Sequence, residues 1–176
     1  MRTNNTSDRT RKMVFISVLV AQGIILSFIE RMLPVPFIAP GAKLGLANIV
    51  SLTAIYMLTF KEAAAVVLLR IIITAVTFGS LSSFLYSLSG GVLSFLVMFF
   101  ITRVFRNDIS LMGVSIVGAV AHNLGQLLVA AFVVNTFLLI TTYLPILMIA
   151  AIPTGLFVGV VARFLINYLE RINMKR

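Results

Sequence analysis

Three hydrogen-bonding side chains interrupt an apolar run in AVAHNLGQLLVAA, residues 119–131. His122 and Gln126 lie four residues apart and therefore share one face of a helix, with Asn123 beside them. Inside a membrane bundle such groups either bond across helices or line a ligand cavity. The glycines and alanines around them leave room for a ligand, which favours the cavity. A metal site is disfavoured, because the segment has one histidine and no thiolate or carboxylate.

An arginine, Arg70, lies near the middle of the apolar segment 63–78. An arginine at the centre of a membrane helix costs ~2.5 to 3.5 kcal/mol on insertion scales, so this side chain should face protein, water or a counter-anion. Thr74 and Thr77 fall on roughly the same face of the helix. Two simpler roles stay open: the guanidinium reaches outward to the interface, or it pairs internally with Glu30.

Further cationic and amide groups surround a proline- and glycine-rich stretch, PGAKLGLANIV, at residues 40–50. Its glycines permit a tight turn and the close approach of a ligand. Lys43, together with Asn48 and the free amides at the start of the following helix, forms a candidate anion-binding end. The alternative is an ordinary turn with a solvated lysine. Just upstream, Glu30 and Arg31 belong either to the same site or to an interfacial ion pair.

Stripes of small residues mark places where membrane helices can approach closely. Ala151, Gly155 and Gly159 recur every four residues, and internal packing is their expected role. Ser17 and Ala21 have the same spacing in the first apolar segment. For these two residues, internal packing and a surface for a partner protein are equally open.

The elements that must position these residues are hydrophobic helices. The chain has 176 residues, of which 60% are hydrophobic and 11% charged, whereas ordinary soluble domains have about a quarter charged residues. The absence of cysteine excludes disulfides and thiolate sites. Lipid requires an internally satisfied backbone, and no segment alternates with period two, so we predict an all-α membrane protein with six transmembrane helices. Their predicted ranges are 13–32, 46–60, 63–78, 85–101, 111–134 and 144–169.

The distribution of lysine and arginine predicts the orientation of these helices. We predict a basic cytoplasmic N-terminal tail at residues 1–12, a single transmembrane domain at residues 13–176, and both termini in the cytoplasm. Of the 14 lysines and arginines, 11 then fall on the cytoplasmic side. These are Arg2, Arg9, Arg11, Lys12, Lys61, Arg103, Arg106, Arg163, Arg171, Lys175 and Arg176. This distribution of basic residues indicates membrane topology and does not indicate nucleic-acid binding.

Three stretches of the sequence carry a family resemblance: PVPFIAPGAKLGLANIVSL, AVAHNLGQL and IPTGLFVGVVARFL. They resemble the membrane family called Gx transporter or heptaprenyl diphosphate synthase component I, over nearly the whole chain from Met13. The helix number and segment character also resemble, more loosely, the substrate-binding S-components of energy-coupling factor (ECF) transporters. The resemblance implies an S-component-like bundle with an outward-facing pocket, capped by the loop between the first two helices.

The same resemblance implies partners. S-components associate with a transmembrane coupling protein and cytoplasmic ATPases, and their first helix often carries an Ala-x-x-x-Ala docking pattern. The corresponding residues here are Ser17 and Ala21, which are the candidate partner-docking residues.

We therefore expect a multi-pass protein of the bacterial cytoplasmic membrane that binds a small anionic or amphipathic metabolite for import. That metabolite would be a vitamin, a cofactor or an isoprenoid- or quinone-related precursor. The candidate substrate-binding residues are Glu30, Arg31, Lys43, Asn48, Arg70, His122, Asn123 and Gln126. Three cations against one acid in this set favour an anionic ligand.

The alternative is a non-catalytic membrane subunit or scaffold in isoprenoid, quinone or flavin-linked electron-transfer pathways. The five acids of the chain form no pair of Asp-rich motifs that could hold the Mg²⁺ ions of a diphosphate-handling synthase. No catalytic activity, cofactor or metal is therefore expected of this chain.

Overall fold

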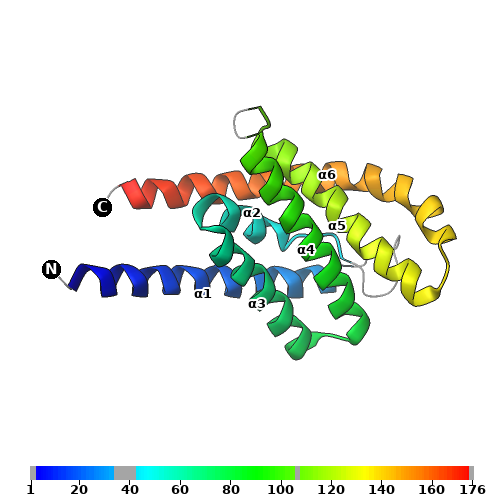
Figure 1. Cartoon of the computed structure of the whole chain (residues 1–176), viewed down its shortest axis with the longest axis horizontal. Coiled ribbons are helices and arrows are strands. Elements are labelled where there is room, and N and C mark those ends of the chain that lie inside the picture. Colours follow the sequence, from blue (N-terminus) through cyan, green and yellow to red (C-terminus); the bar gives the residue numbers. More distant parts are fainter. Residues whose placement is uncertain (1–2, 34–42, 106–107, 175–176) are drawn as a thin grey trace.

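The computed structural model describes residues 3–33, 43–105 and 108–174, and every regular element within them is an α-helix (Figure 1). The helices are α1 (Thr3–Met32), α2 (Asn48–Met57), α3 (Phe60–Phe78), α4 (Leu81–Val104), α5 (Leu111–Val134) and α6 (Leu138–Met174). The prediction of an all-α protein with six helices is thus confirmed. Part of the predicted loop, with Pro34, Pro36, Pro40 and Gly41, lies outside the described residues.

Four of the helices are long and apolar enough to cross a membrane on their own, which makes the chain a multi-pass membrane protein. They are α1 from Asp8, α4, α5, and α6 up to Ile172. α2 has 10 residues, which is about 15 Å of helix against a hydrocarbon layer of ~30 Å. α2 is therefore too short to span the membrane by itself, so it does not make the complete crossing that was predicted for each of the six helices.

Only α5 has both of its predicted boundaries, and three of the differences in the other helices have a clear physical reason. α1 begins at Thr3, so the predicted N-terminal tail is helical from there and continues the first membrane helix. α6 begins before residue 144 and runs through Pro145 and Pro153, because membrane helices tolerate proline when neighbouring groups satisfy the freed carbonyls. α2 ends at Met57 because Thr59 and Glu62 form the capping box that starts α3.

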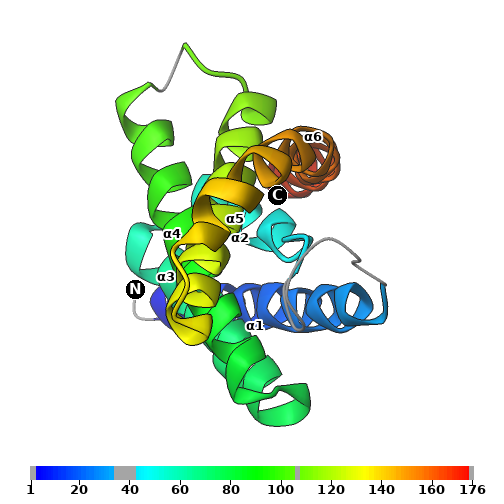
Figure 2. The ribbon, with the colours of Figure 1, turned by 90° about the vertical axis from the view of Figure 1, so that its right-hand side faces the viewer.

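α2 lies between α1 and α6, whose backbones do not come close to each other over their described residues (Figures 1 and 2). α5 packs against α4 and α6, and α3 packs against α1 and α4. The small residues of α6 pack inside the bundle, as predicted, and the glycine among them faces α5: a Cβ added to Gly155 would lie 2.6 Å from the Cα of Ile116. Ala151, one turn earlier, is fully buried.

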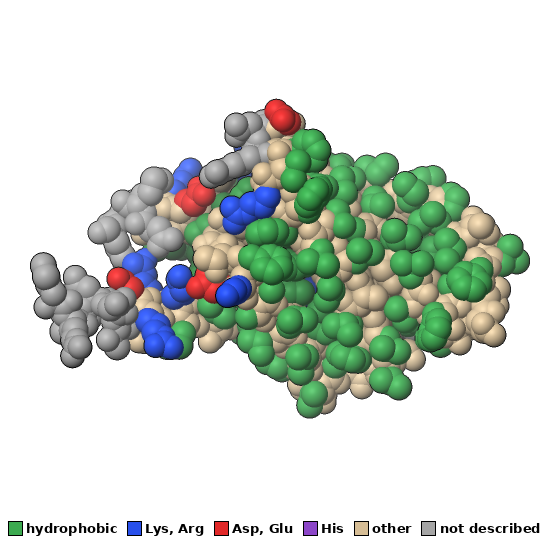
Figure 3. Space-filling model, in the orientation of Figure 1, with side chains coloured by type: hydrophobic (Ala, Val, Ile, Leu, Met, Phe, Trp, Pro, Cys, Tyr) green, Lys and Arg blue, Asp and Glu red, His purple; other side chains and the backbone are tan. Residues whose placement is uncertain are grey.

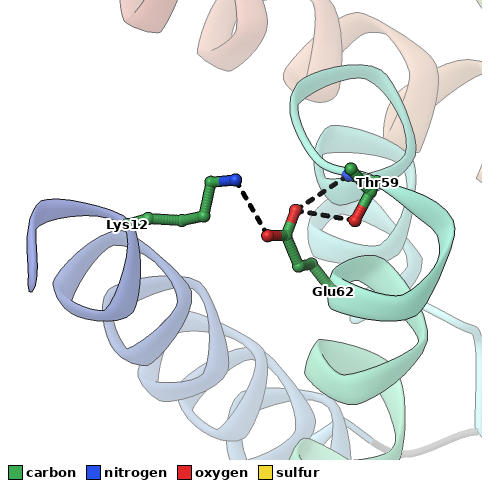
Figure 4. A network of polar contacts seen from close by, with 3 residues as sticks. All are labelled: Lys12, Thr59 and Glu62. Carbon is green, nitrogen blue, oxygen red and sulfur yellow. Dashed lines mark hydrogen bonds and ion pairs between the residues drawn. The ribbon is translucent and has the colours of Figure 1, made fainter. Parts of the chain in front are cut away.

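The two chain ends project from the same end of the bundle (Figure 1). Charged side chains gather toward that end, whereas most of the rest of this face is hydrophobic (Figure 3). There Lys12 of α1 pairs with Glu62 at 2.9 Å, and Glu62 also accepts hydrogen bonds from the backbone N–H and hydroxyl of Thr59 at 3.0 and 2.8 Å (Figure 4). The network ties α1 to the turn between α2 and α3. The cytoplasmic placement of this end stays a prediction.

Candidate ligand-binding site

The segment that leads into α2 is held by the side chain of Gln126 on α5. The backbone N–H of Lys43 donates to Gln126 Oε1 at 2.7 Å, and Gln126 Nε2 donates to the carbonyl oxygen of Lys43 at 2.8 Å. The carboxamide thus pairs with the backbone of Lys43 as a neighbouring strand would. Gln126 is 1% exposed, so losing these two bonds would leave polar groups without water to replace them.

Two residues further along the chain, the same segment is held by a side chain of α1. The carboxylate of Glu30 accepts hydrogen bonds from the backbone N–H groups of Gly45 and Leu46, the second at 3.2 Å. Gly45 has a φ of +88°, which an L side chain rarely adopts, so the turn requires glycine at this position. Glu30 therefore fastens the segment and forms no ion pair with Arg31, contrary to one of the roles considered for it.

Arg70 is buried, with 4% of its surface exposed. Its Nη2 donates to Ser51 Oγ of α2 at 3.2 Å, and its Nε has no hydrogen-bond partner. A Cβ on Gly23 would lie 2.8 Å from Arg70 Cδ, and one on Gly91 would lie 3.5 Å from Nη2. Gly23 of α1 therefore leaves the room that the aliphatic part of the Arg70 side chain occupies, and the guanidinium lies in ordinary contact distance of Gly91 on α4. Arg70 therefore neither extends outward to the membrane interface nor forms an ion pair with Glu30, the two simpler roles considered for it.

His122 is buried to the same degree; neither of its ring nitrogens makes a hydrogen bond of normal geometry, and the backbone of Gly90 lies close to the ring. Glycines again stand against it, since a Cβ on Gly90 would lie 3.0 Å from its Nδ1 and one on Gly45 would lie 3.2 Å from its Cδ2. Buried polar atoms are normally hydrogen-bonded, and an unpaired one costs ~1 to 3 kcal/mol. The unpaired nitrogens of His122 and the unpaired Nε of Arg70 therefore call for a further group, such as water or a ligand.

Lys43 lies between these groups. Its Nζ donates to Ser87 Oγ of α4 at 2.7 Å. Burial lowers the pKa of the Lys43 ammonium below its ordinary value of 10.5; the carboxylate of Glu30 opposes the shift, and the charges of Arg70 and Arg31 add to it. An ammonium in this position favours a negatively charged group beside it.

Four of the predicted residues meet at one small cavity of about 10 Å³, which is room for about one water molecule. It is lined by Ser27, Glu30, Lys43, Gly45, Ala47, Arg70, Ile71, Thr74, Ser87 and His122. The side chains of helices far apart in sequence therefore converge, and Arg70 and His122 do not point to separate surfaces.

The other predicted residues lie around this cavity or away from it. Asn48 stands beside Gly45 without lining the cavity. Asn123 donates to the carbonyl oxygen of Leu147 on α6 at 3.0 Å, so it bonds across helices, the simpler of the two roles considered for it. Arg31 is exposed and lines a neighbouring hollow.

Sequence reasoning missed Ser27 and Ser87 and misplaced one threonine. Thr74 lines the cavity, whereas Thr77 is exposed and bonds to its own helix. The helical spacing of Ser27 and Glu30, three residues apart, was the available signal for the first serine. Nothing in the sequence indicated that Ser87 belongs to the site, because its role depends on the contact with Lys43, which only the structure shows.

A larger hollow of about 480 Å³ lies between α1 and α6, near the start of α1 and the end of α6. Its lining is mostly apolar: Asp8, Arg11, Lys12, Val14, Phe15, Val18, Leu19, Gln22, Met57, Leu58, Leu165, Leu169 and Ile172. Ser17 and Ala21 are exposed on α1 beside it, so they do not pack inside the described bundle, and their docking role stays a prediction. The buried unpaired nitrogens of Arg70 and His122 make the small cavity, and not this hollow, the candidate ligand site.

Over the described residues, no group of three His, Cys, Asp or Glu side chains is placed to hold a metal ion. The polar lining of the small cavity instead consists of hydroxyls, two cations, one carboxylate and the imidazole. Such a set is suited to binding a polar or negatively charged group by hydrogen bonds and charge.

This helical arrangement is that of a known class of membrane protein. The solved S component of a bacterial ECF transporter has the same fold, with a TM-score of 0.56 and 20% sequence identity over 95% of this chain and 97% of that one. The family model described as heptaprenyl diphosphate synthase component I matches residues 19–165. The chain therefore belongs to the heptaprenyl diphosphate synthase component I family. No curated protein matches it significantly.

Proposed function

We propose that this protein is the membrane-embedded substrate-binding component of an ECF-type importer for a small anionic or amphipathic metabolite. ATP hydrolysis is supplied by separate cytoplasmic subunits, and the chain itself is not an enzyme. Its location is the bacterial cytoplasmic membrane, with the termini on the cytoplasmic side.

The observation that carries this proposal is the buried cavity at Arg70 and His122, whose unpaired nitrogens lie at one place in a bundle of S-component fold. An ionised Glu30 leaves one net positive charge when set against Lys43 and Arg70. Burying an uncompensated charge is costly, so a bound anion would stabilise the site.

The small size of the cavity supports a closed state. Movement of the segment at residues 43–47 away from α5 and α1 would admit a metabolite larger than water. That movement breaks the bonds of Gln126 to Lys43 and of Glu30 to Gly45 and Leu46. In this proposal Arg70, Lys43 and His122 bind the ligand, while Gln126 and Glu30 set the position of the segment.

The test is mass spectrometry of small molecules retained by the full chain purified in nanodiscs. We expect the wild type to retain an anionic compound and Arg70→Gln to lose it. Arg163→Gln is the matched control, because Arg163 is exposed on α6. Equal retention by both variants, with the fold intact by circular dichroism, would remove Arg70 from the binding site and with it the basis of the proposal.

The hollow between α1 and α6 suits the expected transmembrane coupling protein, since it is apolar and lies beside the exposed Ser17 and Ala21. Ala21→Leu would place a larger side chain at this surface. We expect that variant to lose co-purification with the coupling protein and the ATPases while keeping the bound metabolite.

The same hollow, together with the family description, favours a second candidate function: a non-catalytic membrane subunit for an isoprenoid- or quinone-pathway enzyme. It predicts a stable complex with a soluble synthase or redox protein and no retained metabolite. Co-purification from the native membrane separates the two functions.

A further inference from the structure

The cavity at Arg70 adjoins a second cavity of similar size on its outer side, also about 10 Å³. The second cavity is lined by Ser27, Phe28, Arg31, Lys43, Thr74, Ala75, Phe78, Gly79, Ser83, Phe84 and Ser87. The two share Ser27, Lys43, Thr74 and Ser87. Lys43 and Ser87 are hydrogen-bonded to each other at 2.7 Å, so their side chains form part of the wall between the cavities.

The two cavities differ in chemistry. The inner one carries Arg70, His122 and Glu30. The outer one carries three aromatic side chains, Phe28 of α1, Phe78 of α3 and Phe84 of α4, and the rings of Phe28 and Phe78 stand 5.1 Å apart. Joined together, they would offer an inner end with Arg70, His122 and Glu30, and an outer end with aromatic rings and the exposed Arg31 at its edge.

The packing around each cavity determines which of the two can enlarge to admit a ligand. On the inner side, glycines lie against the functional side chains: Gly23 against Arg70, and Gly90 against His122. These contacts are already close-packed, so a bulky group has no space to gain there without displacing whole helices. The outer side has no such restriction, because Phe28 and Phe78 are partly exposed.

The electrostatics identify the side chain that can move. Neither Lys43 nor Arg70 forms an ion pair over the described residues, and the carboxylate of Glu30 is held by two backbone N–H groups. Lys43 therefore donates to a neutral hydroxyl where an anion would bind it more strongly. Turning its Nζ from Ser87 toward an incoming anion exchanges a hydrogen bond to a neutral acceptor for one to a negatively charged acceptor, and it opens the wall.

We propose that the two cavities are halves of a single chamber for a compact anion with a short planar apolar part. The anionic group lies at Arg70 and His122, the planar part lies among Phe28, Phe78 and Phe84, and Lys43 leaves Ser87 to bind the anionic group. This inference rests on the proposed function and specifies the class of its substrate. A long isoprenoid chain does not fit it, because the chain would have to extend beyond the aromatic side chains.

The test uses probes of matched size with the full chain in nanodiscs, measured by calorimetric titration. Benzoate carries both the anionic group and the planar part, benzamide lacks the charge, and acetate lacks the ring. We expect benzoate to bind about tenfold or more tightly than either of the others, the loss expected when a charged hydrogen bond or a buried ring is removed. Geranyl phosphate tests the long-chain alternative.

Variants assign the roles within the chamber. Ser87→Ala frees Lys43 and should strengthen benzoate binding about threefold or more, because the ligand no longer competes with a hydroxyl for the ammonium. Ser89→Ala is its control, since Ser89 bonds only to carbonyls of its own helix. Phe78→Ala should weaken benzoate binding without changing acetate binding, and Phe137→Ala, at a 76% exposed position, should change neither.

The outcomes separate this inference from the proposed function. Binding of geranyl phosphate in preference to benzoate, or benzoate binding that is indifferent to both Ser87→Ala and Phe78→Ala, overturns the single chamber. In that case, retention of any metabolite that depends on Arg70 still supports the proposed function. If no probe binds and the wild type retains no metabolite, both fall.

Discussion

The pairing of Gln126 with the backbone of Lys43 leads to a quantitative prediction for Gln126→Ala. The substitution removes hydrogen bonds of 2.7 and 2.8 Å and leaves the Lys43 N–H and carbonyl without their partner. A hydrogen bond contributes about 1 kcal/mol, and an unpaired buried group costs about 1 to 3 kcal/mol. We expect the closed position of residues 43–47 to lose about 2 to 4 kcal/mol, which is roughly a 30- to 700-fold larger open population. Partial burial of Lys43 places the result toward the lower figure.

Hydrogen–deuterium exchange of the peptide containing residues 43–47 measures this change directly. Exchange there should accelerate by the predicted factor, because these amides exchange when the segment opens. Gln126→Glu keeps the acceptor for the Lys43 N–H but loses the donor to its carbonyl, so it should give a smaller acceleration than alanine.

Asn123→Ala is the control for general loosening of α5. Asn123 lies one turn before Gln126, and its substitution removes a single hydrogen bond, the one to Leu147 of α6. It should accelerate exchange in α6 and leave residues 43–47 nearly unchanged. If both alanine variants change the segment equally, the side chain of Gln126 does not hold it and the reasoning is refuted.

Two further predictions concern packing and the polar end. Gly23→Ala places a Cβ 2.8 Å from Arg70 Cδ and should destabilise the protein by about 1 to 3 kcal/mol in chemical unfolding; in an Arg70→Ala background the penalty should disappear, and its persistence would mean that another neighbour causes it. The hydrogen bond from the backbone N–H of Thr59, then Lys12 and the Thr59 hydroxyl, lower the pKa of Glu62 from 4.5 to about 2. A lowered carboxyl pKa stabilises the fold above pH 4.5 and loses that effect as pH falls toward 2. At pH 7 the unfolding free energy of Glu62→Gln should therefore be about 0.5 kcal/mol lower than that of the wild type. At pH 2 the two proteins should be equally stable, and a difference that stays constant from pH 7 to pH 2 would contradict the assignment.

The positions of the helices followed closely from the sequence, and their ends did not. The segment 111–134 was predicted with both of its boundaries from its apolar run; in the structure the Ser110 side chain caps its start, and Asn135 ends it in a left-handed conformation. α6 was predicted six residues too short at its start, from 144 instead of Leu138, since Pro145 suggested a boundary that the membrane environment does not enforce. Local signals locate helices well where they agree with the packing and poorly where a neighbour or the lipid overrides them.

For the site, burial cost was the dependable signal. Arg70, His122 and Gln126 were identified because polar groups at membrane depth are expensive and need a partner. What each partner is, however, lay beyond that signal: Gln126 binds backbone, Asn123 binds α6, and among the side chains that the structure describes only Arg70 and His122 have buried nitrogens without a hydrogen bond.

By itself, the sequence determined that this chain is a helical membrane protein with costly polar groups in its fifth and third segments, because hydrophobic length and the price of burying charge are properties of single segments. Only the tertiary structure decided that Glu30, Lys43, Arg70 and His122 meet at one cavity while Arg31 stays exposed. The reason is physical: convergence depends on how α1, α3, α4 and α5 rotate and approach, and glycines such as Gly23 and Gly90 set those approaches through contacts that have no local signature.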